Sequence, residues 1–348
     1  MAGGAPTILD VAQRAGVSKA LVSAALNDRP GVSSDSRSRI LRAADDLGWR
    51  PSLPARSLST RTSYAVGLVI ARDPKVIGVD PFFPGLIAGV ESVLAPLRRA
   101  LVLSVVEGED AELDAYRSFA RDRRVDGVLL TDLRHDDARI ALVASLGLPA
   151  VTLGRPACPS DLPAVVLDDS AGVRATVAHL ADLGHRRIAH VAGPSGMLHG
   201  SRRRDAFLAA ATELGMSDAP VVETDFSASD GARATRALLD RPDQPTAIVY
   251  ANDPMAIAGL GVAQESGLRV PDDLSITGFD GTDIAQHVYP PLTTVASDPF
   301  AWGAAAARTL LARVDAESVP SVELDPARLV VRGSTGPAPA DDRTPVRP

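Results

Sequence analysis

Residues 10–27, DVAQRAGVSKALVSAALN, hold the side chains best suited to contact a polyanion. Lys19 can hydrogen-bond a base or a phosphate, and short hydroxyls and amides such as Ser23 and Asn27 suit phosphate oxygens. The whole chain has a formal net charge of −7, but residues 1–62 hold nine Lys and Arg against five Asp, which gives +4. Because salt screens charges beyond about 8–10 Å, the acidic remainder is compatible with nucleic-acid binding by this end.

Residues for catalysis or metal binding form no recognisable pattern. The sequence has no G-x-G-x-x-G after a strand and no G-x-x-x-x-G-K-[ST], H-E-x-x-H or G-x-S-x-G motif. Of the six scattered histidines, His185 and His190 are too far apart for an i, i+4 metal pair, and only His199 falls near the cleft expected below. One cysteine, Cys158, excludes a zinc knuckle and an internal disulfide. We therefore predict no catalytic residue, no metal and no cofactor.

Composition and length indicate a soluble protein of more than one domain. The 348 residues are 45% apolar but only 4% aromatic, which is typical of an aliphatic core of helices packed on sheets. No apolar run approaches the roughly 20 residues of a membrane span, and the start MAGGAPTILD lacks the basic and apolar regions of a signal peptide. We expect a cytoplasmic protein with no membrane partner.

Helical periodicity predicts an all-α head of three helices in residues 1–50. Thr7 and Asp10 fit a capping box for the first helix, Gly16 permits a turn, and Ser18 can cap the second. A third helix is expected from about Ser33. Two short helices joined by a small-residue turn fit a helix-turn-helix, whose second helix enters the major groove. A helical hairpin with no special role fits the periodicity equally well.

This segment, TILDVAQRAGVSKALVSAALN…VSSDSRSRILRAADDLGWRPS, resembles the DNA-binding head of the LacI/GalR family of bacterial transcription regulators. The shared motifs are Asp-Val-Ala, Ala-Gly-Val-Ser, Val-Ser, Leu-Asn and Leu-Gly-aromatic-x-Pro. The resemblance implies double-stranded operator DNA as the partner, base edges read by Lys19, Ala20 and Ala24, and further contacts, mostly to phosphates, from Thr7, Ser18, Ser23, Asn27 and Ser33.

The second helix departs from the family pattern. Leu21 and Ala24 stand where members commonly have Thr and Arg. Leu21 cannot hydrogen-bond a phosphate, and Ala24 offers only a methyl contact, for instance to thymine. Lys19 is then the main polar base reader, and its geometry favours guanine.

Residues 51–63 are expected to form a hinge. In the family this segment becomes a short helix when two subunits meet on DNA, and its leucine enters the minor groove. The matching residue is Leu58, with Ala55 beside it and Arg56 available for phosphate; such a wedge kinks the duplex. Pro54 departs from the pattern and is tolerated only in a first helical turn. A plain Pro/Ser linker is the alternative.

From residue 64 onward, eight short Val/Ile/Leu-rich runs alternate with amphipathic stretches, which predicts parallel sheets with helices on both faces. The runs read as strands are YAVGLVI, ALVLSVV, VDGVLLT, PAVTLG, AVVLDD, RIAHVAG, TAIVYAND and LSITGFD. Some 270 residues are too many for one sheet, so two subdomains are expected. The same stretch resembles the periplasmic-binding-protein-like body of the family, in which the chain crosses three times between two doubly wound parallel-sheet subdomains. The expected body is 64–332, divided into 64–163 plus 294–318 and 164–293 plus 319–332.

The resemblance places a small effector, by default a sugar, in the cleft between the subdomains; a nucleoside or small acid stays open. The family's ligand positions fall on Phe82, Phe83, Arg203, Phe226, Asn252 and Asp280. Phe82 and Phe83 could instead be core, and only one arginine of 202–204 is expected to face inward. Asp253 is expected to cap a helix.

The remaining expectations concern assembly and the tail. Residues 333–348 are Pro-rich, polar and without periodicity, so we predict a disordered tail. The tetramer-forming leucine heptad of some family members is missing, so a homodimer that matches a palindromic operator is expected. The predicted function is a ligand-controlled transcription regulator, most simply a repressor. The alternative is the solute-binding protein of a transport system, which shares the body but has no use for the head.

Overall fold

The structure, a computed structural model, describes residues 6–26, 30–50, 62–78, 80–216, 218–316 and 318–340. The chain divides into two compact units, Met1–Tyr64 and Ala65–Pro348, which are described one at a time. Four residues predicted to contact DNA lie outside the described residues: Asn27, Ala55, Arg56 and Leu58.

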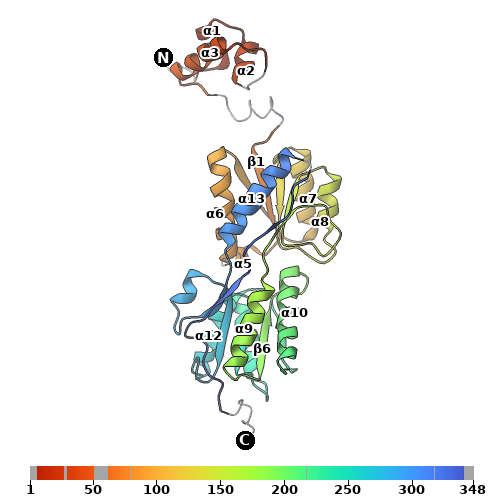
Figure 1. Cartoon of the computed structure of the whole chain (residues 1–348), viewed down its shortest axis with the longest axis vertical. Helices are drawn as coiled ribbons and strands as arrows, with labels where there is room; N and C mark the ends of the chain where they lie inside the picture. The colour runs from red at the N-terminus through yellow and green to blue at the C-terminus, as the bar shows by residue number, and fades with distance from the viewer. Residues whose placement is uncertain are drawn as a thin grey trace. The chain divides into compact units, whose positions relative to one another are not determined.

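The first unit contains the three predicted helices, α1 (Ile8–Ala15), α2 (Lys19–Leu26) and α3 (Ser34–Asp46) (Figure 1). The capping box is confirmed, because the Thr7 backbone amide donates to the Asp10 carboxylate at 2.7 Å. Gly16 ends α1 in the left-handed conformation at φ 65°, which a glycine adopts without strain. A small aliphatic core joins the helices: Val11, Ala12, Ala15, Val22, Ala25, Ile40, Ala43 and Ala44.

The second unit contains two α/β subdomains, each built on a twisted sheet of six strands among the described residues (Figure 1). The first sheet is parallel throughout and has the strand order β11-β5-β4-β3-β1-β2. The elements of this first subdomain are β1 (Ala65–Ile70), α5 (Pro74–Ile77), α6 (Phe82–Leu94), the 3-10 helix η1 (Ala95–Leu97), β2 (Ala100–Val105), α7 (Glu109–Arg121), β3 (Gly127–Leu130), α8 (Ala138–Ser145), β4 (Ala150–Leu153), β5 (Ala164–Val166), α13 (Pro299–Asp315) and β11 (Val322–Glu323).

The sheet of the second subdomain has the order β12-β10-β9-β8-β6-β7, in which only the pairing of β10 with β12 is antiparallel. Its elements are α9 (Ser170–Asp182), β6 (Ile188–Ala192), α10 (Leu198–Glu213), β7 (Val221–Glu223), α11 (Ala228–Leu239), β8 (Ala247–Tyr250), α12 (Asp253–Glu265), β9 (Ser275–Asp280), the 3-10 helix η2 (Asp283–Gln286), β10 (Thr293–Ala296) and β12 (Arg328–Val330).

Helices cover both faces of each sheet, as the alternating pattern predicts. In the first subdomain α6 and α13 pack on one face and α7 and α8 on the other. In the second subdomain α11 and α12 cover one face and α9 and α10 the other. Helices α6 and α13 approach closely at Gly89 and Gly303, where a Cβ atom would lie 2.0 Å from the Phe300 carbonyl oxygen and 2.1 Å from that of Leu86. Side chains larger than hydrogen are therefore excluded there.

The chain crosses between the subdomains three times, in the segments after β5, after β10 and after β11. The predicted boundaries differ by a few residues from those observed. Strands β5 and β11 belong to the first sheet although 164–166 and 322–323 were assigned to the second subdomain, and β10 belongs to the second sheet although 294–296 were assigned to the first. The cause is that hydrogen bonding to a neighbouring strand, rather than sequence position, determines the sheet to which each short edge strand belongs.

The prediction of a disordered tail from residue 333 is wrong for residues 333–340. Ser334 is fully buried, and its hydroxyl donates to the Ile276 carbonyl oxygen at 2.6 Å and accepts from the Thr293 amide at 2.8 Å. The Ala338 amide donates to the Leu183 carbonyl oxygen at 2.9 Å. Polar tail groups thus satisfy backbone groups at the buried starts of β9 and β10. Residues 341–348 lie outside the described part.

Candidate ligand cleft and DNA-binding head

A cavity of about 80 Å³ lies between the subdomains, where the carboxyl ends of strands from both sheets converge. Five of the six predicted effector residues line it: Phe82, Arg203, Phe226, Asn252 and Asp280. The prediction for Phe83 is wrong. This side chain is 1% exposed and packs in the core of the first subdomain, because successive residues of α6 point about 100° apart and only Phe82 is turned to the cleft.

Arg203 is held in place by the second subdomain. Its Nε donates to Asp169 at 2.7 Å, one terminal nitrogen donates to the Ala251 carbonyl oxygen at 2.8 Å, and the guanidinium lies 3.6 Å from the Phe279 ring centroid. A fork of donors fixed in this way is preorganised for a ligand. The expectation that only one arginine of 202–204 faces inward is wrong, because Arg202 also lines the cavity, where it donates to the Arg155 carbonyl oxygen at 2.6 Å.

Asn252 positions the Phe226 ring. Its amide nitrogen donates to the Phe226 carbonyl oxygen at 2.9 Å, and its carbonyl oxygen accepts from the Met255 amide at 2.9 Å. Asn252 is therefore the N-cap of α12, and the expectation that Asp253 is the cap is wrong. The Asp253 side chain is fully buried instead and accepts from the Thr282 amide and hydroxyl and from the Thr294 hydroxyl.

Three cavity residues other than glycine have positive φ angles: Asp132 (50°), Phe226 (72°) and Asp280 (114°). Such conformations cost about 1–3 kcal/mol each and occur preferentially at functional sites. Burial raises the pKa of Asp280 well above its ordinary value, although the Arg203 guanidinium opposes that rise. A neutral carboxyl group at this position can donate one hydrogen bond and accept others.

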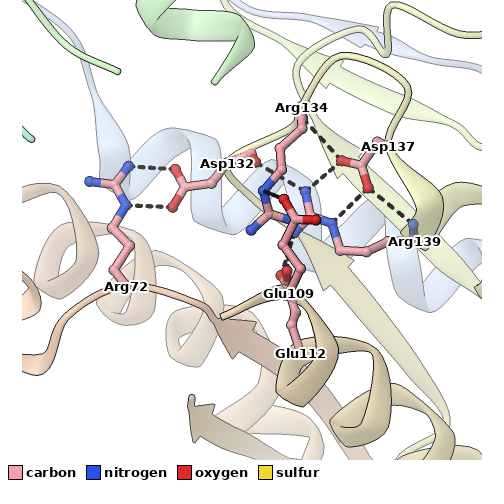
Figure 2. Close-up of polar contacts among 7 residues, drawn as sticks. All are labelled: Arg72, Glu109, Glu112, Asp132, Arg134, Asp137 and Arg139. Atoms are coloured by element: carbon pink, nitrogen blue, oxygen red, sulfur yellow. Dashed lines mark hydrogen bonds and ion pairs between the residues drawn. The ribbon is translucent and has the colours of Figure 1, made fainter. Parts of the chain in front are cut away.

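Sequence reasoning missed the polar residues of the first subdomain. Arg72 follows β1 and donates from two nitrogens to the Asp132 carboxylate, both at 2.6 Å (Figure 2). It also lies 3.3 Å from Asp80. Burial alone would raise the pKa of Asp132, but the charge and hydrogen bonds of Arg72 outweigh burial and lower it to about 2. Arg72 and Asp132 follow the carboxyl ends of β1 and β3, and that position in a parallel sheet could have indicated them.

Aromatic rings form an apolar wall of the cavity. The rings of His199 and Phe226 stack with centroids 5.4 Å apart and planes 13° apart. Trp302 of α13 also lines the cavity, and its indole nitrogen donates to the Val165 carbonyl oxygen at 2.9 Å. Burial lowers the pKa of His199 to about 4, so the ring is neutral at pH 7. His199 is thus a cleft residue that the sequence indicated only by its position.

Five of the described residues predicted to contact DNA lie at the start of α2 or within it, and two lie at the starts of α1 and α3. Ser18, Lys19 and Ala20 are exposed, and Ser23 and Ala24 are half-buried. The Ser18 hydroxyl accepts from the Leu21 amide at 3.2 Å. Thr7 and Ser33 are exposed at the N-termini of α1 and α3, and helix N-termini favour phosphate. The structure leaves these contacts as predictions.

The buried histidine His190, on β6, should make the stability of the body depend on pH. It is 1% exposed, its Nδ1 lies 2.8 Å from the Val249 carbonyl oxygen, and burial lowers its pKa from 6.5 to about 4. In the unfolded chain the His190 imidazole is protonated below about pH 6.5, whereas in the folded chain it is protonated only below about pH 4. The free energy of unfolding therefore decreases as the pH falls between these values. We expect the free energy of unfolding to fall by about 2 kcal/mol from this residue between pH 7 and pH 5.

Urea unfolding at both pH values measures this change. His190→Gln, which keeps a donor for the Val249 carbonyl oxygen, should show a correspondingly smaller fall, whereas His287→Gln, at an exposed position, should behave as the wild type. An equal fall in all three proteins would contradict the assignment.

Neither a metal centre nor a membrane span is found in the described part of the chain. No group of three or more His, Cys, Asp or Glu among the described residues is placed to hold a metal ion. None of the described helices has the length and apolar character needed to span a membrane.

Comparison with known proteins identifies the class of each unit. Residues 7–52 match the bacterial regulatory proteins of the lacI family, and residues 177–335 match a periplasmic binding protein-like domain. The transcriptional regulator CelR of Thermobifida fusca is 35% identical over 332 residues, which are 94% of this chain and 95% of CelR. The repressor CytR of Escherichia coli K12 is 32% identical over 343 residues, which are 96% of this chain and 98% of CytR.

Solved structures agree with this assignment. A CelR–cellobiose complex superposes with a TM-score of 0.73 at 33% identity and covers 94% of this chain and 99% of its own. The Lac repressor dimer bound to operator and the anti-inducer ONPF has a TM-score of 0.82 at 29% identity and covers 96% and 100%. The fold and the head therefore define a helix-turn-helix regulator with a periplasmic-binding-protein-like body. The chain belongs to the lacI family of bacterial regulatory proteins, and it is a DNA-binding transcriptional regulator rather than a transport solute-binding protein.

Proposed function

We propose that this regulator is a repressor that binds a palindromic operator as a homodimer and is controlled by a neutral sugar in the cleft. The likeness to the operator-bound Lac repressor dimer supports the dimer and the operator, and the likeness to the CelR–cellobiose complex supports a sugar. Lys19 reads bases and Leu58 wedges into the operator centre in this proposal. The relatives are named as regulators rather than enzymes, so we assign no catalysis and place the protein in the cytoplasm with the DNA.

The observation that carries the choice of a neutral ligand is the balance of charges around the cavity. Two of its arginines are neutralised by carboxylates: Arg72 by Asp132 and Asp80, and Arg203 by Asp169. In all, three arginines and four aspartates line the cavity: Arg72, Arg202, Arg203, Asp80, Asp132, Asp169 and Asp280. Arg202 donates only to a backbone carbonyl oxygen, but the aspartates outnumber the arginines. A phosphate or carboxylate entering the cleft would therefore lose its hydration without meeting a net positive charge.

The other cleft groups suit a sugar. Vicinal hydroxyl groups need paired donors and acceptors, which the Arg203 fork and the Asp280 carboxyl can provide. The C–H face of a sugar ring needs an apolar surface, which the Phe226 ring can provide. A ligand that favours one angle between the subdomains would shift DNA affinity by the difference in its affinity for the two conformations, typically about 1–3 kcal/mol.

Thermal unfolding with a panel of ligands tests the proposal. The panel contains cellobiose, glucose and ribose, the nucleosides cytidine and adenosine, and the anions glucose 6-phosphate and gluconate. A ligand at one hundred times its Kd stabilises the native state by about 2.7 kcal/mol, which raises the Tm by several degrees. We expect this for at least one neutral sugar and for neither anion. Stabilisation by an anion alone, or by a nucleoside alone, would overturn the proposed ligand class.

DNA binding by the head makes a separate prediction. Lys19→Ala should weaken binding to the protein's own operator about 5- to 150-fold, because a base contact contributes about 1–3 kcal/mol. It should weaken binding to unrelated DNA far less. Arg236→Ala, an exposed cation of the second subdomain, is the matched control. Fluorescence anisotropy across a salt series measures both; an equal loss on the two DNAs would mean that Lys19 contacts phosphate only.

A further inference from the structure

In addition to the three segments that cross between the subdomains, a set of noncovalent contacts joins the two subdomains. The loop between β3 and α8 runs along the start of α10 and forms an isolated antiparallel bridge between Arg134 and Met197. Within this bridge the Leu198 amide of α10 donates to the Leu133 carbonyl oxygen at 2.7 Å. A ring nitrogen of His135 also lies 3.2 Å from the Ser201 hydroxyl oxygen.

Leu198 adds an apolar contact to these polar ones. Although it is the first residue of α10, it is only 3% exposed and belongs to the core cluster of the first subdomain, together with Leu133 and Ile140. Burying a leucine contributes about 1.5–3 kcal/mol. The neighbouring residue His199 lines the ligand cavity, so this contact lies directly beside the cleft.

A buried cluster of charges fixes the loop on the first subdomain (Figure 2). Arg139 is 1% exposed and donates to both carboxylate oxygens of Asp137, to Glu112 at 2.6 Å, and to the backbone oxygen of Asp132 at 3.0 Å. Arg134 donates to the other Glu112 oxygen at 2.7 Å. Because Arg139 also holds the backbone of Asp132, whose side chain is a cavity group paired with Arg72, the cluster joins the loop to the cleft wall.

From these contacts we infer that residues 132–137 are a latch that holds the two subdomains in the observed arrangement, with Leu198 as its apolar contact and the Arg139 cluster as its base. The contacts across the gap are noncovalent, so they can open while the three crossing segments stay intact. Met197 strengthens the link, because its sulfur lies 3.7 Å from an Arg72 nitrogen. The latch holds the subdomains without ligand, so it does not depend on the proposed function.

Distance measurement on the full chain tests the latch without ligand or DNA. Spin labels are placed on Arg117→Cys of α7 and Glu213→Cys of α10, both exposed, in a Cys158→Ser background. Pulsed electron paramagnetic resonance should give one narrow distance distribution in this background. Leu198→Ala should shift it to longer distances and broaden it. Leu208→Ala, at an exposed leucine of the same helix, should leave it unchanged.

A distribution in Leu198→Ala identical to the background, or a background that is already broad, would overturn the inference. If Leu198→Ala fails to fold, the same distance measurement is made on Leu198→Pro. Proline suits the first position of a helix, and Met197 before it is extended (φ −92°, ψ 131°), as a residue before proline must be. This variant removes the amide donor to Leu133 and should also lengthen the distance. Because no ligand is added, failure here is distinct from failure of the sugar panel.

Discussion

Replacing Glu112 by alanine is expected to lower the free energy of unfolding of the body by about 3–5 kcal/mol. Glu112 is 1% exposed and accepts from both Arg139 and Arg134, so its removal leaves a buried guanidinium short of negative charge. Burial would lower the pKa of Arg139, but its carboxylate partners raise it, so the arginine stays charged and cannot relieve the imbalance by losing a proton. Urea unfolding at pH 7 measures the change.

Glu109→Ala is the matched control for this prediction. Glu109 lies on the same helix and 3.5 Å from the same Arg134, but its side chain is 74% exposed. An exposed ion pair contributes about 0–1 kcal/mol, so the control should lose at most that much. Similar losses in the two variants would show that the cluster is hydrated and that its burial does not matter for stability.

Asp280→Ala is expected to weaken binding of the sugar identified by the panel by about 30- to 1,000-fold. A side chain that makes two hydrogen bonds to ligand hydroxyls contributes about 2–4 kcal/mol, since the hydroxyls it leaves buried find no other partner. The unliganded variant should melt no lower than the wild type, because burial of this carboxyl group opposes its ionisation and makes it costly to the folded state. Isothermal titration calorimetry and a thermal melt measure the two quantities.

The variant Asp280→Asn tests whether the neutral or the ionised form of the Asp280 carboxyl group binds the ligand. Asparagine has nearly the same shape, and like a protonated carboxyl group it can both donate and accept. With the pKa of Asp280 raised, the variant should stay within about tenfold of the wild type in affinity. A loss as large as that of Asp280→Ala would indicate that the ionised form binds the ligand.

Local patterns of the sequence predicted the elements of the fold well. The cap at Thr7, the turn at Gly16 and the eight strands read from apolar runs all depend on residues within one turn or one strand, where spacing alone determines which side is buried. The strands β7, β10, β11 and β12 were not read as strands. They are two to four residues long and are stabilised by a neighbour that is distant in sequence.

The cleft was predicted in part. The resemblance assigned Phe226, Asn252 and Asp280 to the cleft, and the structure places all three in the cavity, at or just after the carboxyl ends of strands of the second subdomain. The prediction for Phe83 was wrong because the rotation of α6 about its axis determines which of two adjacent aromatic residues faces the cleft. That rotation is fixed by the close packing of α6 against α13, which is more than 200 residues away in the chain.

The sequence by itself determined the helix-turn-helix head, the alternation of strands and helices, and the family. Only the tertiary structure decided that Arg139, within an ordinary polar stretch, is buried, and that Ser334 hydrogen-bonds to the starts of two inner strands, β9 and β10. The physical reason is the same for both. A buried polar or charged group is stable only where partners from other segments converge on it, and that convergence is a property of the folded chain rather than of any neighbourhood along the sequence.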